Sequence, residues 1–496
     1  MATARLHAQT AAAHVALTLP AQTGGPQMPA GFVGLSYEVQ QLKDPAFFAA
    51  ANTGLIRQFR ALSSRGVLRL GGNTSEYGWW QPTPDSPEPA HPQTRVVAGE
   101  PQAEFYPVTP EAVNNLDAFL RAAGWSCIYG LNLGTSTPER AAQEAAYAAK
   151  ILGPRLEYFQ VGNEIDLFAP HLRNPETWNP QRYLEQWLSF ARAVAASVPD
   201  AKFGMPDVAS RLNWLTEIAE LWPTIQNPPR VVSLSHHYYF GGPATNPQVN
   251  IHNLLSPESA ATVQGQADIA KAAAGKMGLP LRMTEGNTCY RGGKPGLSDV
   301  FAAAIWAADY ALHLASNGYT GVNLHGGSGP SVANSVGGAL PGDQLLREQG
   351  ATPEQITSHP HPFYTPIASF GSEYVMEPVA YGLKFAGQMI GGRFFEDDLS
   401  GRLLAAGVDA RAYAAKMPDG EVKVTLLNKD AERDVTVDLD CGSGQSGPVE
   451  ATTLHAPALD SRKAAISAAK HLGQSIHGRC TVMVPRATGM CVSFRA

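Results

Sequence analysis

Short apolar runs recur from residue 32 to residue 324, and segments with helical periodicity separate most of them. Each run is short enough to be one buried strand, and the runs cover residues 32–37, 67–70, 127–133, 156–161, 202–205, 231–239, 281–284 and 319–324. Runs of this length between turn signals are typical of parallel strands that are buried on both faces. Eight strand–helix units predict an α/β fold, a closed (β/α)8 TIM barrel.

The helical segments carry their own start and stop signals. In the clearest case Thr137 can cap the first turn, Pro138 occupies the first helical position and Gly153 ends the run. Further helices are expected at 183–198, at 299–317 between Ser298 as the cap and Gly318 as the terminator, and at 379–390.

The pattern changes after residue 391 to alternating strands with tight turns. Strands are expected at 410–417, 422–427, 435–439, 451–455, 481–484 and 490–494, which predicts an antiparallel β-sandwich. A strand-like stretch at 14–19 precedes the barrel and is expected to join this sandwich. We therefore divide the chain into residues 1–27, which complete the sandwich, residues 28–391, which form the barrel, and residues 392–496, which form the rest of the sandwich.

Composition and charge exclude several classes of protein. The 496 residues include 37 Lys and Arg against 43 Asp and Glu, a formal net charge of −6. No basic run of five or more residues occurs, which argues against nucleic acid and membrane surfaces as partners. No apolar run approaches the roughly 18 residues that span a bilayer. Residues 1–22 lack the compact apolar stretch and cleavage site of a signal peptide, so none is predicted.

The cysteines do not indicate a metal centre. The five are Cys127, Cys289, Cys441, Cys480 and Cys491, and their spacings match no zinc signature. We expect mostly buried thiols, and one bridge among the last three stays an open alternative. No metal or other cofactor is expected.

Two glutamates follow predicted strands four and seven. Asn163-Glu164 ends the fourth strand and Thr284-Glu285 ends the seventh, and the carboxyl ends of barrel strands form the active face. Paired carboxylates hydrolyse acetals, with retention of configuration at a separation of about 5 to 5.5 Å and inversion at about 6.5 Å or more. Because an ionised neighbour raises the pKa of the other carboxyl, we predict Glu164 as the acid/base and Glu285 as the nucleophile. Asn163 is expected to donate its amide to the sugar 2-hydroxyl.

Three motifs add a family resemblance: residues 68–73 (LRLGGN), residues 235–239 (SHHYY) and the loop 285–293. With the glutamate pair, which is typical of a large clan of retaining glycosidases, they resemble glycoside hydrolase family 79, which contains bacterial β-glucuronidases and heparanases. The resemblance covers nearly the whole chain. It implies a glucuronic-acid-containing carbohydrate as the substrate and a secreted or periplasmic location.

The resemblance also implies how the sugar carboxylate is bound. Tyrosine hydroxyls and glycine N–H groups take this role in the family, and Tyr290 and Gly292 match those positions. Tyr238 matches the strand-six tyrosine that approaches the nucleophile, and Glu38 matches an acid that accepts sugar hydroxyls. Tyr239 is expected to be a packing residue.

Buried partners are expected beneath the two carboxylates. We expect Arg69 to be an inward ion partner near the nucleophile. His236 and His237 are expected to orient neighbouring groups rather than to react.

The chain departs from the family pattern after the eighth strand. Gly326 and Gly327 fit the family's glycine-rich turn, but the next expected tyrosine is missing, and we assign its role to Tyr364 after an insertion. The inserted segment 328–361 is long for a structureless connection, which favours a functional loop that closes one end of the cleft. It contains one Arg, Arg347, and no Lys, so sulfate binding is not expected there.

These features predict a retaining exo-β-glucuronidase that releases terminal β-D-glucuronic acid, or its 4-O-methyl form. The alternatives are a heparanase-like endo-β-glucuronidase, a glycosidase of the same clan that acts on neutral sugars, and a non-catalytic carbohydrate-binding protein.

Overall fold

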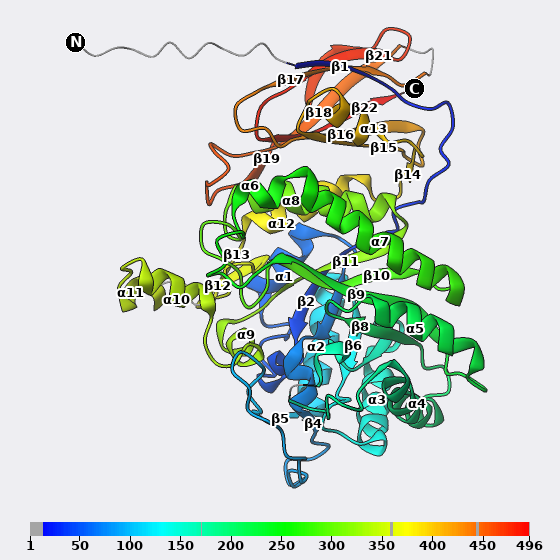
Figure 1. The fold of residues 1–496 in the computed structure, drawn as a ribbon, viewed down its shortest axis with the longest axis vertical. Coiled ribbons are helices and arrows are strands. Elements are labelled where there is room, and N and C mark those ends of the chain that lie inside the picture. Colours follow the sequence, from blue (N-terminus) through cyan, green and yellow to red (C-terminus); the bar gives the residue numbers. More distant parts are fainter. Residues whose placement is uncertain (1–12, 170, 358–360, 443–445, 496) are drawn as a thin grey trace.

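The computed structural model describes residues 13–169, 171–357, 361–442 and 446–495. Its centre is a closed barrel of eight parallel strands in the circular order β2-β3-β6-β7-β8-β9-β10-β11 (Figure 1). The strands are β2 (Val33–Glu38), β3 (Val67–Gly71), β6 (Ser126–Leu131), β7 (Leu156–Val161), β8 (Phe203–Val208), β9 (Val231–Gly241), β10 (Leu281–Cys289) and β11 (Tyr319–Gly326). All eight predicted strands are confirmed, because each apolar run is buried between the barrel interior and the outer helices.

Helices surround the barrel on the outside. They are α1 (Thr53–Leu62), α2 (Pro110–Ala123), α3 (Pro138–Leu152), α4 (Pro180–Ser197), α5 (Asn213–Leu221), α6 (Ile251–Leu255), α7 (Pro257–Met277), α8 (Phe301–Ser316) and α12 (Pro378–Ala386). The Thr137 side chain accepts a hydrogen bond from the Arg140 backbone N–H, so the predicted cap of α3 is confirmed. No helix in the described part of the chain is long and apolar enough to cross a membrane.

The predicted cap of α8 is wrong. This helix begins at Phe301 instead of Asp299, and the residue at its N-cap position is Val300. Ser298 instead braces the preceding loop, because its hydroxyl accepts from the Lys294 backbone N–H at 2.9 Å and from the Thr288 hydroxyl at 2.7 Å.

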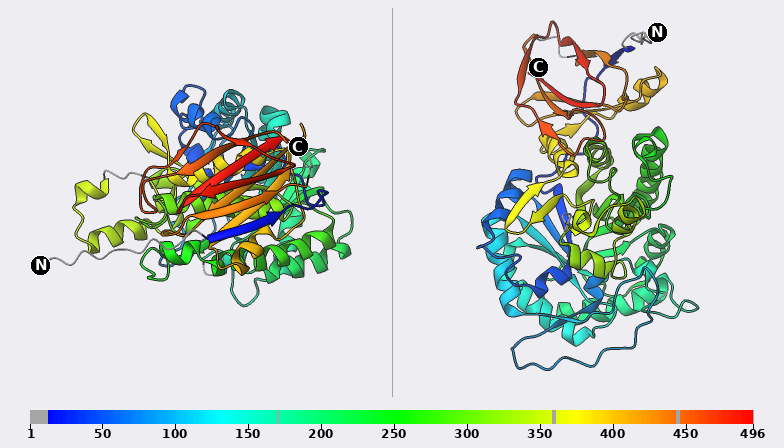
Figure 2. Two further views of the ribbon diagram at one scale, coloured as in Figure 1. Left: turned by 90° about the horizontal axis from the view of Figure 1, so that it is seen from above. Right: turned by 90° about the vertical axis from the view of Figure 1, so that its left-hand side faces the viewer.

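A β-sandwich is stacked on the barrel (Figure 2). One sheet has the order β1-β17-β21, and the other has the order β14-β15-β16-β22-β18-β19, with β20 paired to β18. The strands are β1 (Ala13–Thr18), β14 (Arg393–Phe394), β15 (Ala410–Lys416), β16 (Glu421–Asn428), β17 (Val435–Asp440), β18 (Pro448–His455), β19 (Ala465–Ile466), β20 (Lys470–Gln474), β21 (Arg479–Val484) and β22 (Thr488–Arg495). The N-terminal strand β1 joins the first sheet as expected, but it pairs with β17 in parallel.

The two chain segments that connect the barrel to the sandwich run side by side. Gly25 donates its backbone N–H to the Phe394 carbonyl, and Met28 donates to the Gly392 carbonyl. Below the larger sheet, Asp309 of α8 forms ion pairs with Lys429 and Arg411 of the sandwich. The contact between barrel and sandwich therefore combines apolar packing with a cluster of buried charges.

The segment after β11 is more regular than a loop. It contains α9 (Gly329–Ser335), α10 (Pro341–Glu348) and α11 (Pro353–Thr357), and α10 and α11 project sideways from the barrel (Figure 1). Among the described residues of this segment, Ser335 at the end of α9 and Val336 after it line the cavity at the carboxyl end of the barrel. Smaller elements complete the described fold: the pair β4 (Gly78–Trp80) and β5 (Tyr106–Val108), the hairpin β12 (Ile367–Phe370) and β13 (Glu373–Met376), and α13 (Leu399–Ala405).

The five cysteines lie among the described residues and form no disulfide. Four of them are buried, and Cys480 is partly buried. The prediction of buried thiols is therefore confirmed over the alternative of a bridge among the last three cysteines.

Candidate active site

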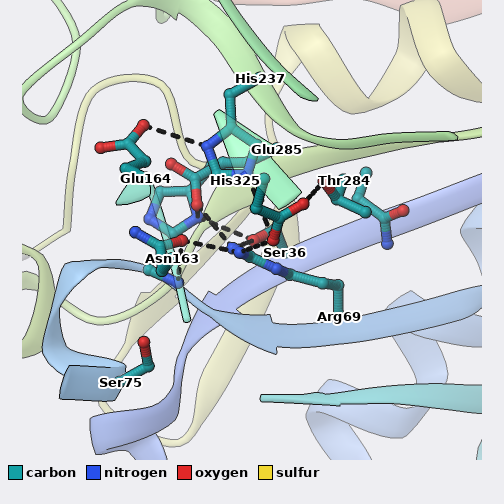
Figure 3. A network of polar contacts seen from close by, with 12 residues as sticks. Ser36, Arg69, Ser75, Asn163, Glu164, His237, Thr284, Glu285 and His325 are labelled. Atoms are coloured by element: carbon teal, nitrogen blue, oxygen red, sulfur yellow. Dashed lines mark hydrogen bonds and ion pairs between the residues drawn. The ribbon is translucent and has the colours of Figure 1, made fainter. Parts of the chain in front are cut away.

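The two glutamates predicted to be catalytic face each other at the carboxyl end of the barrel (Figure 3). Glu164 follows β7 with φ of 49°, and Glu285 lies within β10. Carboxylate oxygens of the two side chains lie within 4.8 Å of each other. Both residues line a cavity of about 520 Å³. This separation is in the range of retaining glycosidases, because an inverting pair needs about 6.5 Å or more to admit water.

The surroundings of Glu285 stabilise its ionised form. Arg69 donates from Nη1 to Oε2 at 2.7 Å, and the Tyr239 hydroxyl donates to Oε1 at 2.8 Å. Burial by itself raises the pKa of Glu285, but the nearby charges of His325, His237 and Arg69 outweigh it and lower the pKa to about 2. Glu285 is therefore a carboxylate at neutral pH, as a nucleophile must be.

The surroundings of Glu164 raise its pKa and so favour its protonated form. Burial raises its pKa, and the negative charge of Glu285 raises it further, while a hydrogen bond from His237 partly opposes both effects. Two carboxyl groups whose surroundings separate their pKa values in this way are suited to the roles of proton donor and nucleophile. The electrostatics favour the same assignment that the sequence suggested.

A buried ion network lies beneath the two glutamates. The Arg69 guanidinium is fully buried, where it was expected, and its Nη2 donates to Asp207 Oδ2 at 2.6 Å and to Asn163 Oδ1 at 2.7 Å. Burial raises the pKa of Asp207, but the adjacent charges of Arg69 and His237 hold it well below its usual range. Asp207 was missed in the sequence, although it is a third acid near the end of a predicted strand.

Most of the hydrogen-bonding capacity of the Asn163 amide is already used within the protein. Its Oδ1 also accepts from the Gly72 backbone N–H at 3.1 Å, and its Nδ2 donates to Asn73 Oδ1 at 2.9 Å. An amide nitrogen carries two hydrogens, so one is left over, but Asn163 is buried and is not among the residues that line the cavity. Its partner Asn73 does line the cavity, and the sequence did not mark it as a site residue.

A second buried acid, Glu76, holds the backbone at Asn163, next to Glu164. Its Oε1 accepts from the Asn163 N–H at 2.8 Å, and its Oε2 accepts from the N–H groups of Leu133 at 3.0 Å and Gly134 at 2.5 Å. Burial raises the pKa of Glu76 to about 7, against the effect of these hydrogen bonds. Nothing in the sequence distinguished Glu76 from an ordinary loop acid, because its three donors come from two other segments.

Glu38 lies below the cavity and not in its lining. Its side chain is 1 % exposed, and its Oε2 accepts from the backbone and hydroxyl of Thr74 at 3.0 Å and 2.6 Å. Its Oε1 lies 3.3 Å from His325 Nε2, and His325 lines the cavity with Nδ1 3.5 Å from Glu285. In this structure Glu38 contacts His325 and does not line the cavity, which departs from the expected direct contact with sugar hydroxyls.

The strand-six tyrosine beside the nucleophile is Tyr239, not Tyr238. The ring of Tyr238 stacks on Tyr310 of α8, with centroids 5.4 Å apart, outside the barrel. Successive side chains of a strand point to opposite faces, so His237 and Tyr239 share the inner face and Tyr238 cannot. Tyr238 is among the residues that line the cavity, but the hydroxyl that reaches Glu285 is that of Tyr239. The expectation that Tyr238 approaches Glu285 is therefore wrong by one residue, because the sequence did not show which face of β9 is the inner one.

Tyr290 and Tyr364 both line the cavity, as expected. Tyr290 is 37 % exposed, and its ring centroid lies 6.5 Å from that of Tyr239, whereas Tyr364 is buried with its ring 6.2 Å from Tyr239. Asn287 at the end of β10 donates to the carbonyls of Tyr364 and His325. These hydrogen bonds hold the Tyr364 segment against β10 and β11. Nothing in the sequence pattern marked Asn287 for this position.

The three candidate glycines, Gly292, Gly326 and Gly327, do not line the cavity. The Gly292 carbonyl accepts from the Phe363 N–H at 2.8 Å, and the Gly327 N–H donates to the Thr365 hydroxyl at 3.2 Å. A Cβ atom on Gly326 would come within 2.6 Å of the Pro366 and Thr365 side chains. These glycines are therefore packing positions that admit the segment carrying Tyr364.

The cluster of Glu164, His237 and Glu285 is also the one group in the described residues whose ligand atoms are arranged to hold a metal ion. His237 Nδ1 lies 3.0 Å from Glu164 Oε1, so that nitrogen already has a partner.

Similarity to known proteins is clearest at the level of the fold. No known family model matches the chain. Among solved structures, a 4-O-α-L-rhamnosyl-β-D-glucuronidase from Fusarium oxysporum aligns with 96 % of this chain and 100 % of its own, with a TM-score of 0.69 and 16 % identity. An α-L-arabinofuranosidase from Thermotoga maritima aligns with 97 % and 99 %, with a TM-score of 0.65 and 13 % identity. These likenesses show a fold that glycosidases use.

Two curated proteins are similar in sequence. The β-glucuronidase of Aspergillus niger is 28 % identical over 281 residues, which are 53 % of this chain and 51 % of the relative. The β-glucuronidase of Neurospora crassa is 30 % identical over 290 residues, 53 % of this chain and 50 % of the relative. The chain spans about half the length of these curated relatives.

Proposed function

We propose that this protein is a retaining exo-β-glucuronidase of the glycoside hydrolase family 79 type, acting on terminal β-D-glucuronic acid. One observation carries the proposal. Glu285, whose pKa is lowered by nearby positive charges, and Glu164, whose pKa is raised by burial, have carboxylate oxygens within 4.8 Å of each other in one cavity. Both curated relatives bear the name β-glucuronidase, which supports this choice of sugar.

The geometry fits a double displacement. Glu285 attacks the anomeric carbon and forms a glycosyl ester, while Glu164 gives its proton to the departing oxygen. The free alcohol leaves, and Glu164, now a carboxylate, takes a proton from water as the water oxygen attacks the ester carbon. Glu285 is released as a carboxylate and Glu164 is protonated again. Arg69 and the Tyr239 hydroxyl stabilise the Glu285 charge before and after the ester stage.

Two segments from different parts of the chain contribute to one part of the cavity lining. Gly99 and Glu100, in the connection after β4, line the cavity together with Ser335 and Val336 around the end of α9. Gln102 donates its backbone N–H to the Asn334 carbonyl at 2.9 Å, which fastens the two segments to each other. We take these two fastened segments as a wall of the cavity that favours a chain end over the middle of a chain, which supports exo action.

The direct test measures chromophore release from an aryl β-glucuronide and the matching aryl β-glucoside. Wild type is compared with Glu164→Gln and Glu285→Gln. We expect cleavage of the glucuronide by wild type and a loss of several orders of magnitude in both variants. Cleavage of the glucoside alone would replace the proposal with a neutral-sugar glycosidase. Shortening of a glucuronic-acid polymer without turnover of the aryl glucuronide would replace it with an endo-acting, heparanase-like enzyme.

A further inference from the structure

Asp166 is a fully buried acid two residues after Glu164, in the turn that follows β7. Its Oδ1 accepts a hydrogen bond from the Ala209 backbone N–H at 2.7 Å. Its Oδ2 accepts from the backbone N–H groups of Ser210 at 3.1 Å and Arg211 at 2.9 Å. The three donors are consecutive residues of the loop that follows β8. One side chain of the Glu164 segment therefore fastens the neighbouring loop.

The two linked segments each begin with an acid in the left-handed region. Glu164 has φ of 49° and Asp207 has φ of 55°, and Asp166 and Ala209 follow them by two residues. A residue other than glycine in this region carries conformational strain, which persists only where the surroundings hold it. The hydrogen bonds of Asp166 join these two strained turns to each other.

The fastened loop forms part of the cavity wall beside Glu164. Leu167, Ala209 and Ser210 line the cavity together with Glu164, whereas Asp166 does not line it. Because β7 and β8 are neighbours in the barrel, this wall lies on the same side of the cavity as Glu164. The proton donor of a glycosidase faces the departing oxygen, so the wall lies on the side of the departing group.

A buried carboxylate suits this task better than a neutral side chain. Within the described residues, the hydrogen-bond partners of Asp166 are these three backbone N–H groups. Hydrogen bonds to a charged acceptor are shorter and roughly twice as strong as those between neutral groups. The Asp166 charge also raises the pKa of Glu164, in the same direction as burial and the charge of Glu285. Its removal therefore acts on both the surroundings and the protonation of Glu164.

We propose that Asp166 is a positioning residue, which holds residues 209–211 beside Glu164 and so fixes the wall against which the departing group lies. This inference rests on the proposed function, because it takes Glu164 as the proton donor. A departing group that needs a proton depends on its alignment with that donor, and one that leaves without a proton does not. The role of Asp166 therefore predicts a loss of activity that depends on the leaving group.

The test compares kcat/KM against pH for a methoxyphenyl and a dinitrophenyl β-glucuronide in wild type and Asp166→Asn. We expect a loss of about 10- to 100-fold for the methoxyphenyl glucuronide, part of what general acid catalysis contributes, and of less than about threefold for the dinitrophenyl glucuronide. The alkaline limb should move to lower pH, because Glu164 must be protonated and the lost charge no longer raises its pKa. Asp430→Asn is the matched control, since Asp430 of the sandwich also accepts from consecutive backbone N–H groups, those of Glu432 and Arg433.

A second pair of variants tests the role without a change at the buried acid. Ser210→Pro removes one of the three donors, and Ser210→Ala removes the same hydroxyl but keeps the N–H. We expect kcat/KM for the methoxyphenyl glucuronide to be about 3- to 10-fold lower in Ser210→Pro than in Ser210→Ala, as for one lost hydrogen bond, with no difference for the dinitrophenyl glucuronide. The alkaline limb should stay in place in both variants, because Asp166 keeps its charge.

The outcomes separate this role from the proposed function. Equal losses on both glucuronides in Asp166→Asn, with an unmoved alkaline limb, would overturn the role, because they indicate a merely structural contribution. If the circular dichroism spectrum and melting temperature show that Asp166→Asn does not fold, the Ser210 pair decides, and equal rates in those two variants would overturn the role. Either result leaves the proposed function standing. A wild type that cleaves neither glucuronide would overturn the proposed function and this role with it.

Discussion

The Nδ1 atom of His237 lies 3.0 Å from Oε1 of Glu164, and on its other side Nε2 lies 3.6 Å from Asp207. This imidazole lies between Glu164 and the buried Asp207, which pairs with Arg69. Several acids surround it, and their charges raise the pKa of His237 against the lowering effect of burial. Its positive charge in turn lowers the pKa of both Glu164 and Glu285.

Replacement of His237 by Asn should therefore move both limbs of the pH–rate profile to higher pH. The acid limb follows Glu285, which must be ionised, and the alkaline limb follows Glu164, which must be protonated. Removal of a group that lowers both pKa values raises both. The measurement is kcat/KM against pH on an aryl β-glucuronide, with His252→Asn as an exposed control. A lower kcat/KM at every pH, with both apparent pKa values unchanged, would show that His237 has only a structural role.

Replacement of Glu164 by Gln should affect substrates according to their leaving group. A good leaving group such as dinitrophenolate departs without a proton, whereas a methoxyphenolate needs one, and general acid catalysis contributes about 10²- to 10⁴-fold. We expect little loss in the first chemical step for the dinitrophenyl glucuronide and a large loss for the methoxyphenyl glucuronide. Stopped-flow bursts and steady-state rates measure the two steps. Equal losses on both substrates would contradict the assignment of the acid.

The variants Tyr239→Phe and Tyr238→Phe form a matched pair. Tyr239→Phe removes the hydrogen bond to Glu285 and should lower kcat/KM about 10- to 100-fold, as expected for a bond to a charged group. Tyr238→Phe should change it less than about threefold, because the Tyr238 ring stacks on α8 outside the barrel. A larger loss in Tyr238→Phe would favour the original sequence-based choice.

Asp207→Asn should destabilise the fold by about 3 to 5 kcal/mol, because it leaves Arg69 buried with one partner fewer. The folded-state pKa of Asp207 lies below its unfolded value of about 3.9, so its stabilising effect is present above that pH and is lost as the pH falls. The variant should therefore lose less stability than wild type between about pH 5 and pH 3. Urea unfolding at several pH values measures this, with exposed Asp200→Asn as the control. Equal slopes for Asp207→Asn and wild type would contradict the argument.

The sequence by itself determined the barrel and the two glutamates. Each of the eight strands is a local apolar run, and parallel strands bring their carboxyl ends to one face, so Glu164 and Glu285 had to share that face. The N-terminal strand was also predictable, because its alternation matches the pattern of the C-terminal strands that it joins.

Only the tertiary structure decided which side chains meet. The inner face of β9 selects Tyr239 over Tyr238, and a strand pattern that is apolar on both faces carries no sign of that choice. Glu76 and Asp207 have their roles because donors from distant segments converge on them after folding. Local periodicity fixes elements and their ends, whereas contacts between elements depend on how the elements pack.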